Sequence, residues 1–254
     1  MRVTLSSWDA FHDVVKKFES YPDYLWRGQR CDGKEWSLKS SFDRKFPDIP
    51  IDERHRKLEG ILENFGGHLR DLPQGRRNNA LTADDKWAIG QHYGLLTPLL
   101  DWTECPYIAA YMAFHKKVKD QQTDNRVIYA LSKAVKLLQA KTKDSASKEL
   151  LRSERFVAFP EISKKRLSDK QNKRLKAQKG KFTLALNGDD IAKNVTRLAG
   201  KGKYQGQTIL AEILIPDRFR AECLEYLRAR GLTHGTLFPD YSGAVEICKH
   251  DTGV

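Results

Sequence analysis

Helix-like and strand-like segments alternate along this chain without the regular spacing of a β-α-β repeat. Apolar residues recur at helical spacing in five segments, and short apolar runs bounded by turn residues mark five strands. This irregular order favours an α+β fold over a doubly wound parallel sheet. We expect one domain over residues 1–254, with a mixed or antiparallel sheet surrounded by helices. The predicted helices span residues 8–21, 51–72, 86–93, 106–114 and 218–230, and the predicted strands span residues 24–29, 126–132, 182–186, 208–215 and 244–248.

The length of 254 residues is ample for one core, because even a chain of about 150 residues buries roughly two thirds of its unfolded surface. No apolar run approaches the roughly 20 residues that cross a bilayer. The first residues also lack the apolar core of a secretion signal. The cysteines lie far apart and form no CxxC pair, so free thiols in a reducing compartment are expected. We therefore expect a cytoplasmic protein that does not span a membrane.

The chain carries 45 Lys and Arg against 33 Asp and Glu, a formal net charge of +12. Such an excess favours a polyanionic partner. A basic helical or loop segment is expected at about 134–181, and from Lys164 to Lys181 its only acid is Asp169. This stretch fits either a solvated surface or a nucleic-acid contact that continues toward Lys203. The candidate contact residues are Lys164, Lys165, Arg166, Lys173, Arg174, Lys176, Lys179 and Lys181.

Several motifs follow one another in a recognisable order. They are Trp26–Gln29 (WRGQ), Trp36–Arg44, Gln91–Thr103 (QHYGLLTPLLDWT) continued by Ala109–Phe114, then Arg174–Thr183 and Thr236–Asp240. Together they resemble the FRG domain, a bacterial family named for an aromatic-Arg-Gly motif, over nearly the whole chain. The family usually has Arg after the threonine of the central block, where this chain has Pro98. An anion contact made by that arginine is therefore missing or moved, and Pro98 favours an extended backbone at Thr97.

An arginine beside a glycine at a strand end offers a planar, charged fork to a phosphate, and the glycine allows close approach to the backbone. This arrangement resembles the first motif of ADP-ribosyltransferases, and implies a fold like theirs and NAD as co-substrate. The resemblance implies that Arg27, with Gly28 and Gln29, binds the NAD diphosphate or the adjoining ribose. It further implies that His92, Tyr93 or Trp102 packs against the nicotinamide or ribose, and that Thr97 and Thr103 orient hydroxyl groups. The catalytic carboxylate would belong to Asp101, Asp240 or Glu246.

Each of these residues also has a structural interpretation. Arg27 would equally form a buried salt bridge with Asp101, and His92 would be a buried, hydrogen-bonded histidine. The tryptophans 26, 36 and 102 fit the core better than a ligand contact. Asp240 after Pro239 would build a turn before Gly243.

The leading hypothesis is an NAD-dependent ADP-ribosyltransferase that modifies nucleic acid, with RNA as the expected acceptor; a protein acceptor fits almost as well. The resemblance also implies a toxin in phage defence, with a cognate antitoxin and a chaperone as partners. The alternative is a nucleic-acid-binding module without catalysis, in which the motifs only build the core. A third hypothesis, a metal-dependent nuclease using Asp101 and Asp240, has no compact carboxylate cluster in the sequence to support it.

Overall fold

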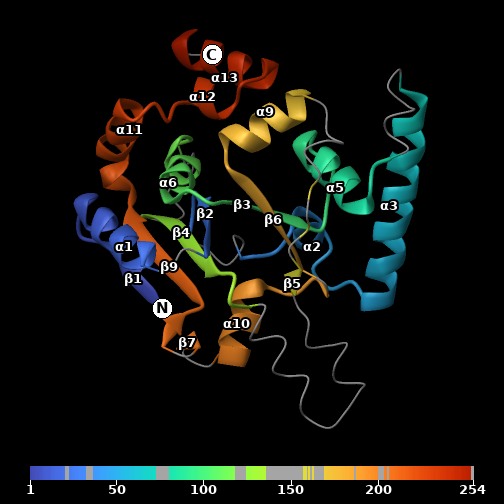
Figure 1. Ribbon diagram of the computed structural model, residues 1–254, viewed down its shortest axis with the longest axis horizontal. Coiled ribbons are helices and arrows are strands. Elements are labelled where there is room, and N and C mark those ends of the chain that lie inside the picture. The colour runs from blue at the N-terminus through green and yellow to red at the C-terminus, as the bar shows by residue number, and fades with distance from the viewer. Residues whose placement is uncertain are drawn as a thin grey trace.

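The structure is a computed structural model of the chain (Figure 1). It describes all residues except 21–22, 33–36, 73–79, 118–123, 136–156, 159, 161, 163–168, 186, 200–202, 205 and 253–254. Much of the basic segment expected at 134–181, including residues 136–156 and 164–166, and the tryptophan at position 36 thus lie outside the described residues. Within the described part, no helix has both the length and the apolar character needed to cross a membrane.

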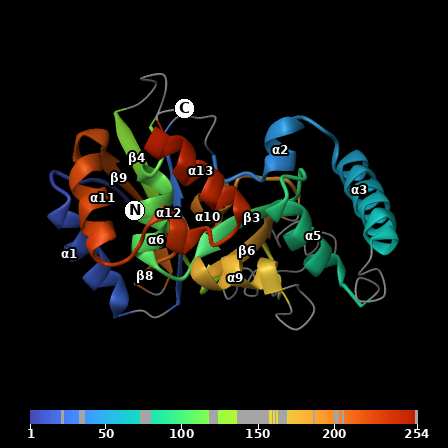
Figure 2. The ribbon, with the colours of Figure 1, turned by 90° about the horizontal axis from the view of Figure 1, so that it is seen from above.

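Within the part of the chain that the structure describes, ten helices surround the sheet. They are α1 (Asp9–Glu19), α2 (Ser41–Lys45), α3 (Ile51–Asp71), α5 (Ala83–His92), α6 (Pro106–Phe114), α9 (Asp169–Ala177), α10 (Ile191–Ala199), α11 (Arg220–Ala229), α12 (His234–Leu237) and α13 (Tyr241–Thr252), and a short 3-10 turn covers Asp217–Phe219. Figures 1 and 2 show α1 and α11 at one end of the molecule and α3 at the other end.

The central sheet has seven strands in the order β1-β9-β4-β2-β3-β6-β5. The β1–β9 pair is parallel and the other pairs are antiparallel, so the sheet is mixed, as expected for an α+β fold. Its strands are β1 (Arg2–Thr4), β2 (Tyr24–Gln29), β3 (Leu99–Thr103), β4 (Asn125–Ser132), β5 (Val157–Ala158), β6 (Gly180–Ala185) and β9 (Leu210–Pro216). A separate hairpin joins β7 (Lys203–Tyr204) and β8 (Gln207–Thr208).

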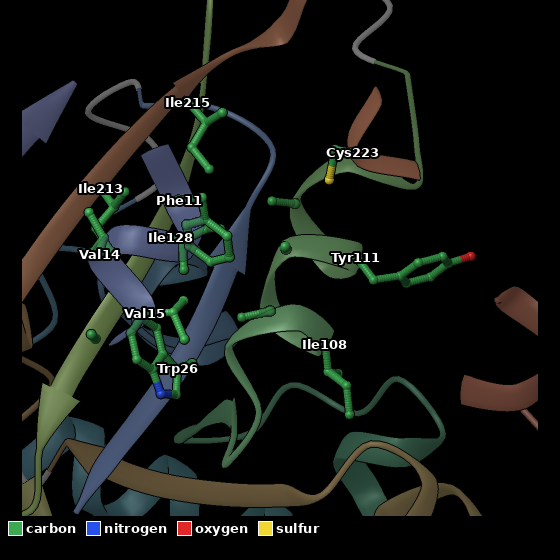
Figure 3. Packing of buried hydrophobic residues seen from close by; sticks show 14 of the residues in the cluster. Phe11, Val14, Val15, Trp26, Ile108, Tyr111, Ile128, Ile213, Ile215 and Cys223 are labelled. Atoms are coloured by element: carbon green, nitrogen blue, oxygen red, sulfur yellow. The ribbon is translucent and has the colours of Figure 1, made fainter. Parts of the chain in front are cut away.

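Both faces of the sheet are packed. One face of β2, β4 and β9 meets α1, α6 and α11, as the side chains in Figure 3 show for Phe11, Trp26 and Ile213. The opposite face carries Leu25, Leu100 and other apolar side chains that pack against α10. A third cluster joins β3 and β6 to α2, α3 and α5. Because residues alternate along a strand, neighbouring residues of β2 serve two different cores.

Most of the predicted elements are confirmed, with shifted ends. Helices α1, α3, α5, α6 and α11 and strands β2, β4, β6 and β9 all overlap the segments predicted for them. Helix α5 begins earlier than expected because the Thr82 hydroxyl accepts from the Asp85 backbone while Asp85 bonds back to Thr82. This reciprocal capping satisfies two backbone donors that the first helical turn leaves free.

The predicted strand at residues 244–248 is wrong, because these residues belong to helix α13. Asp240 starts the helix: its carboxylate accepts from the Gly243 backbone N–H at 3.0 Å, and its carbonyl accepts from the Ala244 N–H at 3.1 Å. Such a side-chain acceptor is the usual beginning of a helix. Glu246 therefore lies on a helix and not on the strand expected for a transferase glutamate.

Strand β3 was not among the strands predicted from the sequence. Four of its five residues are buried, so the run lacks the alternation of apolar and polar residues that marks a half-exposed strand. Pro98 directly precedes the strand, a position at which proline is tolerated. The extra strand matters because it carries Asp101 and Thr103 into the middle of the sheet.

Candidate functional site

The sheet opens between its two central strands. β2 pairs with β4 along its whole length, and β3 pairs with β6 from Leu99 to Thr103. Between β2 and β3, however, the pairing consists of Trp26 with Thr103 alone. Beyond that pair, the Arg27 side chain replaces the missing ladder bonds, since its Nη1 donates to the backbone carbonyl of Asp101 at 2.7 Å.

A cavity of about 260 Å³ lies at this opening. Its walls come from both sides of the opening, from helices α5 and α6, and from α9 with Phe238. The lining is mainly apolar with a few polar groups, which is the usual make-up of a ligand pocket. The residues that line it are Trp26, Arg27, Gly28, Ala88, Ile89, Gln91, His92, Asp101, Trp102, Thr103, Ile108, Ala109, Met112, Arg174, Leu175, Gln178, Phe182 and Phe238.

Arg27 keeps part of its hydrogen-bonding capacity unused. Its Nε is buried and has no hydrogen-bond partner among the described residues. Burial lowers the pKa of the Arg27 guanidinium, the charge of Asp101 raises it, and the charge of Arg44 lowers it. An arginine remains protonated in spite of such shifts. A charged guanidinium with an unsatisfied donor is a suitable partner for an anion.

Gly28 is required by the distance between β2 and α6. A Cβ atom at this position would lie 1.9 Å from the carbonyl oxygen of Ala109 and 2.7 Å from the backbone nitrogen of Ala113. Any side chain would therefore push the helix away from the strand. The glycine of the WRGQ motif thus sets the position of the α6 wall of the pocket.

Asp101 is held by a hydrogen bond from α5. Gln91 Nε2 donates to Asp101 Oδ2 at 2.8 Å, and the hydroxyl of the buried Thr97 donates to Gln91 Oε1. The proposed salt bridge between Arg27 and Asp101 takes a different form, because the guanidinium bonds to the backbone carbonyl and not to the carboxylate. The carboxylate is solvent-exposed and contributes to the same pocket as Arg27.

Helix α9 and the following Gln178 form one wall of the pocket, and hydrogen bonds connect this wall to β3 and to α12. The Thr103 hydroxyl donates to the Gln178 carbonyl at 2.7 Å, and Gln178 Nε2 donates to the Leu237 carbonyl at 3.0 Å. Arg174 lies over the Phe238 ring, with 4.7 Å from the guanidinium carbon to the ring centre, and forms an ion pair with Asp240 at 3.8 Å. These contacts hold α9 across the pocket.

His92 lies beside this wall and lines the pocket. Burial and the charge of Arg174 lower the pKa of His92, whereas the charge of Asp240 raises it. The net direction is downward, which favours the neutral imidazole near pH 7. His92 is thus suited to hydrogen bonding and packing rather than to holding a positive charge.

The structure brings together only some of the residues selected from the sequence. Arg27, Gly28, His92, Asp101, Trp102 and Thr103 line the pocket, and Thr97 lies behind it. Trp102 is buried, and its indole N–H donates to the Thr183 hydroxyl at 2.8 Å, so its side chain is a core residue.

The remaining candidates lie outside the lining. Gln29 is 3% exposed with both amide atoms unpaired among the described residues, Tyr93 is 68% exposed, and Asp240 caps α13. Glu246 is on α13 and pairs with Lys116 and Lys249. Of the basic candidates within the described residues, Lys173, Lys176, Lys179 and Lys181 are exposed, and only Arg174 reaches the pocket.

Several pocket residues were not among those selected from the sequence. Gln91, Gln178, Phe182 and Phe238 line the cavity, as do Ile108 and Met112 of α6. Gln91 had the clearest signal, because it opens the QHYGLLTPLLDWT block. The apolar residues had no signal of their own, since a pocket wall and a core helix have the same composition. Among the described residues, no group of three or more His, Cys, Asp or Glu could hold a metal ion.

The fold and the site define an α+β protein with a pocket where its central sheet opens. Residues 22–122 match the family model of the FRG domain, which supports the resemblance that the motifs suggested. The match includes Arg27, Gln91 and Asp101, whereas Arg174, Gln178 and Phe238 lie beyond it. No curated protein and no solved structure matches the chain.

Proposed function

We propose that this protein is an ADP-ribosyltransferase that takes NAD as co-substrate and nucleic acid, expected to be RNA, as acceptor. The observation that carries the proposal is that one pocket contains both a charged guanidinium with an unpaired donor and a carboxylate held in place. Arg27 and Asp101 are these two groups. The pairing fits a reaction in which a phosphorylated sugar must be bound and positive charge at that sugar stabilised.

The properties of the pocket fit part of a dinucleotide. Arg27 lines the cavity and its guanidinium would bind phosphate, and the apolar walls formed by Ile89, Ile108 and Phe182 suit a flat aromatic ring. The cavity of about 260 Å³ is slightly smaller than typical ligand pockets, which cover roughly 300–1,000 Å³. It therefore suits one nucleotide half of NAD, with the remainder outside.

When bound, NAD supplies the ADP-ribosyl group. The bond from ribose C1′ to nicotinamide breaks, and its electron pair leaves with nicotinamide. An acceptor atom forms a new bond to C1′ and loses its proton. Asp101 would stabilise the positive charge that develops at the sugar, since a preorganised opposite charge lowers the barrier. The neutral His92 would take up the acceptor proton or orient the acceptor. Thr103 would contact a ribose hydroxyl.

The proposed acceptor follows from charge. The chain has a net charge of +12, and the exposed Lys173, Lys176 and Lys179 lie on or next to α9, which forms a wall of the pocket. A polyanion bound there would lie next to the site of transfer. The proposal includes a cytoplasmic bacterial toxin with a cognate antitoxin and a chaperone as partners, an expectation from the resemblance alone.

Label transfer from adenylate-labelled NAD tests the proposal. Purified protein is incubated with total cellular RNA, DNA or protein, and the labelled class is identified. We expect labelled RNA with the wild type, and a loss of at least about 100-fold with Arg27→Ala and with Asp101→Asn, as for removal of one transition-state contact. Arg56→Ala, which removes an exposed arginine from α3, is the matched control and should transfer label normally.

The outcomes separate the hypotheses. Label on protein alone would keep the transferase and replace its acceptor. No label on any class, together with retained RNA binding, would reject the transferase and leave the binding module. Thermal unfolding of each variant shows whether a lost activity reflects a lost fold.

A further inference from the structure

Four groups form a continuous chain of hydrogen bonds that begins and ends on β3. The Leu99 backbone N–H donates to the Thr97 hydroxyl oxygen at 3.3 Å. The Thr97 hydroxyl donates to Gln91 Oε1, and Gln91 Nε2 donates to Asp101 Oδ2 at 2.8 Å. This series of hydrogen bonds therefore connects the backbone N–H of Leu99 to the Asp101 carboxylate, which the proposed function uses.

The carboxylate end sets the orientation of the Gln91 amide. A backbone N–H can only donate and an ionised carboxylate can only accept. The nitrogen of the Gln91 amide must therefore face Asp101. The amide oxygen then faces Thr97 and accepts its single hydrogen, while the Thr97 oxygen accepts from Leu99. In the reversed orientation the amide oxygen would face the Asp101 carboxylate, and that contact would be repulsive.

Thr97 itself is held firmly. It is 0% exposed, and its backbone N–H donates to the Ser41 hydroxyl oxygen at 3.1 Å. Its carbonyl accepts from the Phe42 N–H at 3.2 Å and from the Ser41 hydroxyl at 3.3 Å. Pro98 restricts Thr97 further by favouring an extended backbone. Helix α2 and the proline thus fix the hydroxyl that orients Gln91.

We infer that Gln91, oriented by Thr97, is a positioning residue that holds the Asp101 carboxylate by Oδ2 and leaves Oδ1 for the substrate sugar. Oδ1 has no hydrogen-bond partner among the described residues. The role of Asp101 toward the sugar rests on the proposed function, whereas the hydrogen bonds do not. Loss of the Thr97 hydroxyl would let the Gln91 amide rotate, and the carboxylate would lose its fixed position.

The first measurement concerns the Gln91 side-chain amide and needs no NAD. In ¹⁵N-labelled protein, the Gln91 NH₂ resonances should show slowed hydrogen exchange in the wild type and in Thr97→Ser, which keeps the hydroxyl. Thr97→Val has nearly the same shape without the hydroxyl, and there the slowed exchange should be lost. Thr196→Val removes an exposed hydroxyl that bonds to the Ala192 carbonyl on α10, and serves as the matched control.

The second measurement separates kcat from KM for NAD. Thr97→Val should lower kcat by about 10- to 100-fold with a nearly unchanged KM, because a displaced reacting group affects the transition state more than binding. Thr97→Ser should restore kcat. Gln91→Glu places a second carboxylate against Asp101, so the acidic limb of its rate–pH profile should move to higher pH. If Thr97→Val does not fold, Gln91→Ala should show the same loss in kcat.

The two measurements distinguish the inference from the proposed function. The inference is overturned if the Gln91 resonances and kcat of Thr97→Val match those of the wild type and of Thr196→Val. A wild type with the expected resonances that consumes no NAD would support the hydrogen-bond chain and reject the transferase.

Discussion

At the scale of single residues, burial controls which groups near the pocket carry charge. The pKa values of His92, His115 and His234 are all lowered, with desolvation as the largest cause. These imidazoles are therefore neutral near pH 7, and the charges at the pocket belong to Arg27, Arg174 and the nearby carboxylates. His115 shows the largest of the three shifts, with a pKa lowered to about 4.

His115 should make the protein less stable in mild acid. Its pKa is about 4 when folded and roughly 6.5 when unfolded. As the pH falls from about 6.5 toward 4, the unfolded chain binds a proton that the folded protein does not, so stability decreases, by at most about 3 kcal/mol. Urea unfolding at pH 7, 6, 5 and 4.5 should show a smaller decrease for His115→Asn than for the wild type. Equal decreases in both proteins would mean that another group is responsible.

At the scale of secondary-structure elements, close contact between β2 and α6 builds the pocket wall. Ala109 and Ala113 face Gly28, so the helix backbone approaches the strand backbone directly. Two arginines hold the end of this helix: the buried Arg126 donates to the carbonyl of Ala113, and the half-buried Arg220 donates to that of Phe114. These bonds satisfy carbonyls that the last helical turn leaves without partners.

Gly28→Ala should destabilise the protein by about 1–3 kcal/mol, as overpacking of a close contact does. The added Cβ would lie 1.9 Å from a backbone oxygen of α6, and neither element can yield easily. Gly60→Ala is the matched control, because a Cβ there meets nothing within 4 Å. In the helix interior it should stabilise the protein by about 0.5–1 kcal/mol. Equilibrium denaturation compares the two variants, and equal effects would contradict the close contact.

At the scale of the whole molecule, positive charge lies next to the pocket opening. Lys173, Lys176 and Lys179 are exposed on α9 or just after it. Helix α9 contributes Arg174 and Leu175 to the pocket wall and lies between the sheet and α12 (Figure 1). Lys181 is less available, because it pairs with Glu104 at 3.5 Å. A nucleic acid bound along α9 would therefore be guided by these three lysines.

Replacing Lys173, Lys176 and Lys179 together by glutamine should weaken RNA binding and its salt dependence. The slope of log affinity against log salt should decrease in magnitude by about 2, because each phosphate contact on a single strand contributes roughly 0.7. Substituting the exposed Lys16, Lys17 and Lys45 by glutamine removes the same charge elsewhere and should leave the slope nearly unchanged. Equal slopes for the two triple variants would show that α9 does not bind the RNA.

The sequence by itself determined the strongly periodic elements and the resemblance to the FRG domain. Helix α1 was predictable because Phe11, Val14, Val15 and Phe18 lie on one face, and all four are buried. Strand β2 was predictable from its aromatic residues and from the glycine near its end. These features depend on neighbours a few residues apart, so a short window of sequence contains the information.

The tertiary structure decided which carboxylate accompanies Arg27. Asp101, Asp240 and Glu246 were equivalent in the sequence, but Asp101 alone of the three lines the pocket, while Asp240 caps a helix and Glu246 lies on its surface. The choice follows from the opening between β2 and β3, where Arg27 bonds to a carbonyl 74 positions away. Contacts at such separations depend on how whole elements pack, and no local pattern encodes that packing.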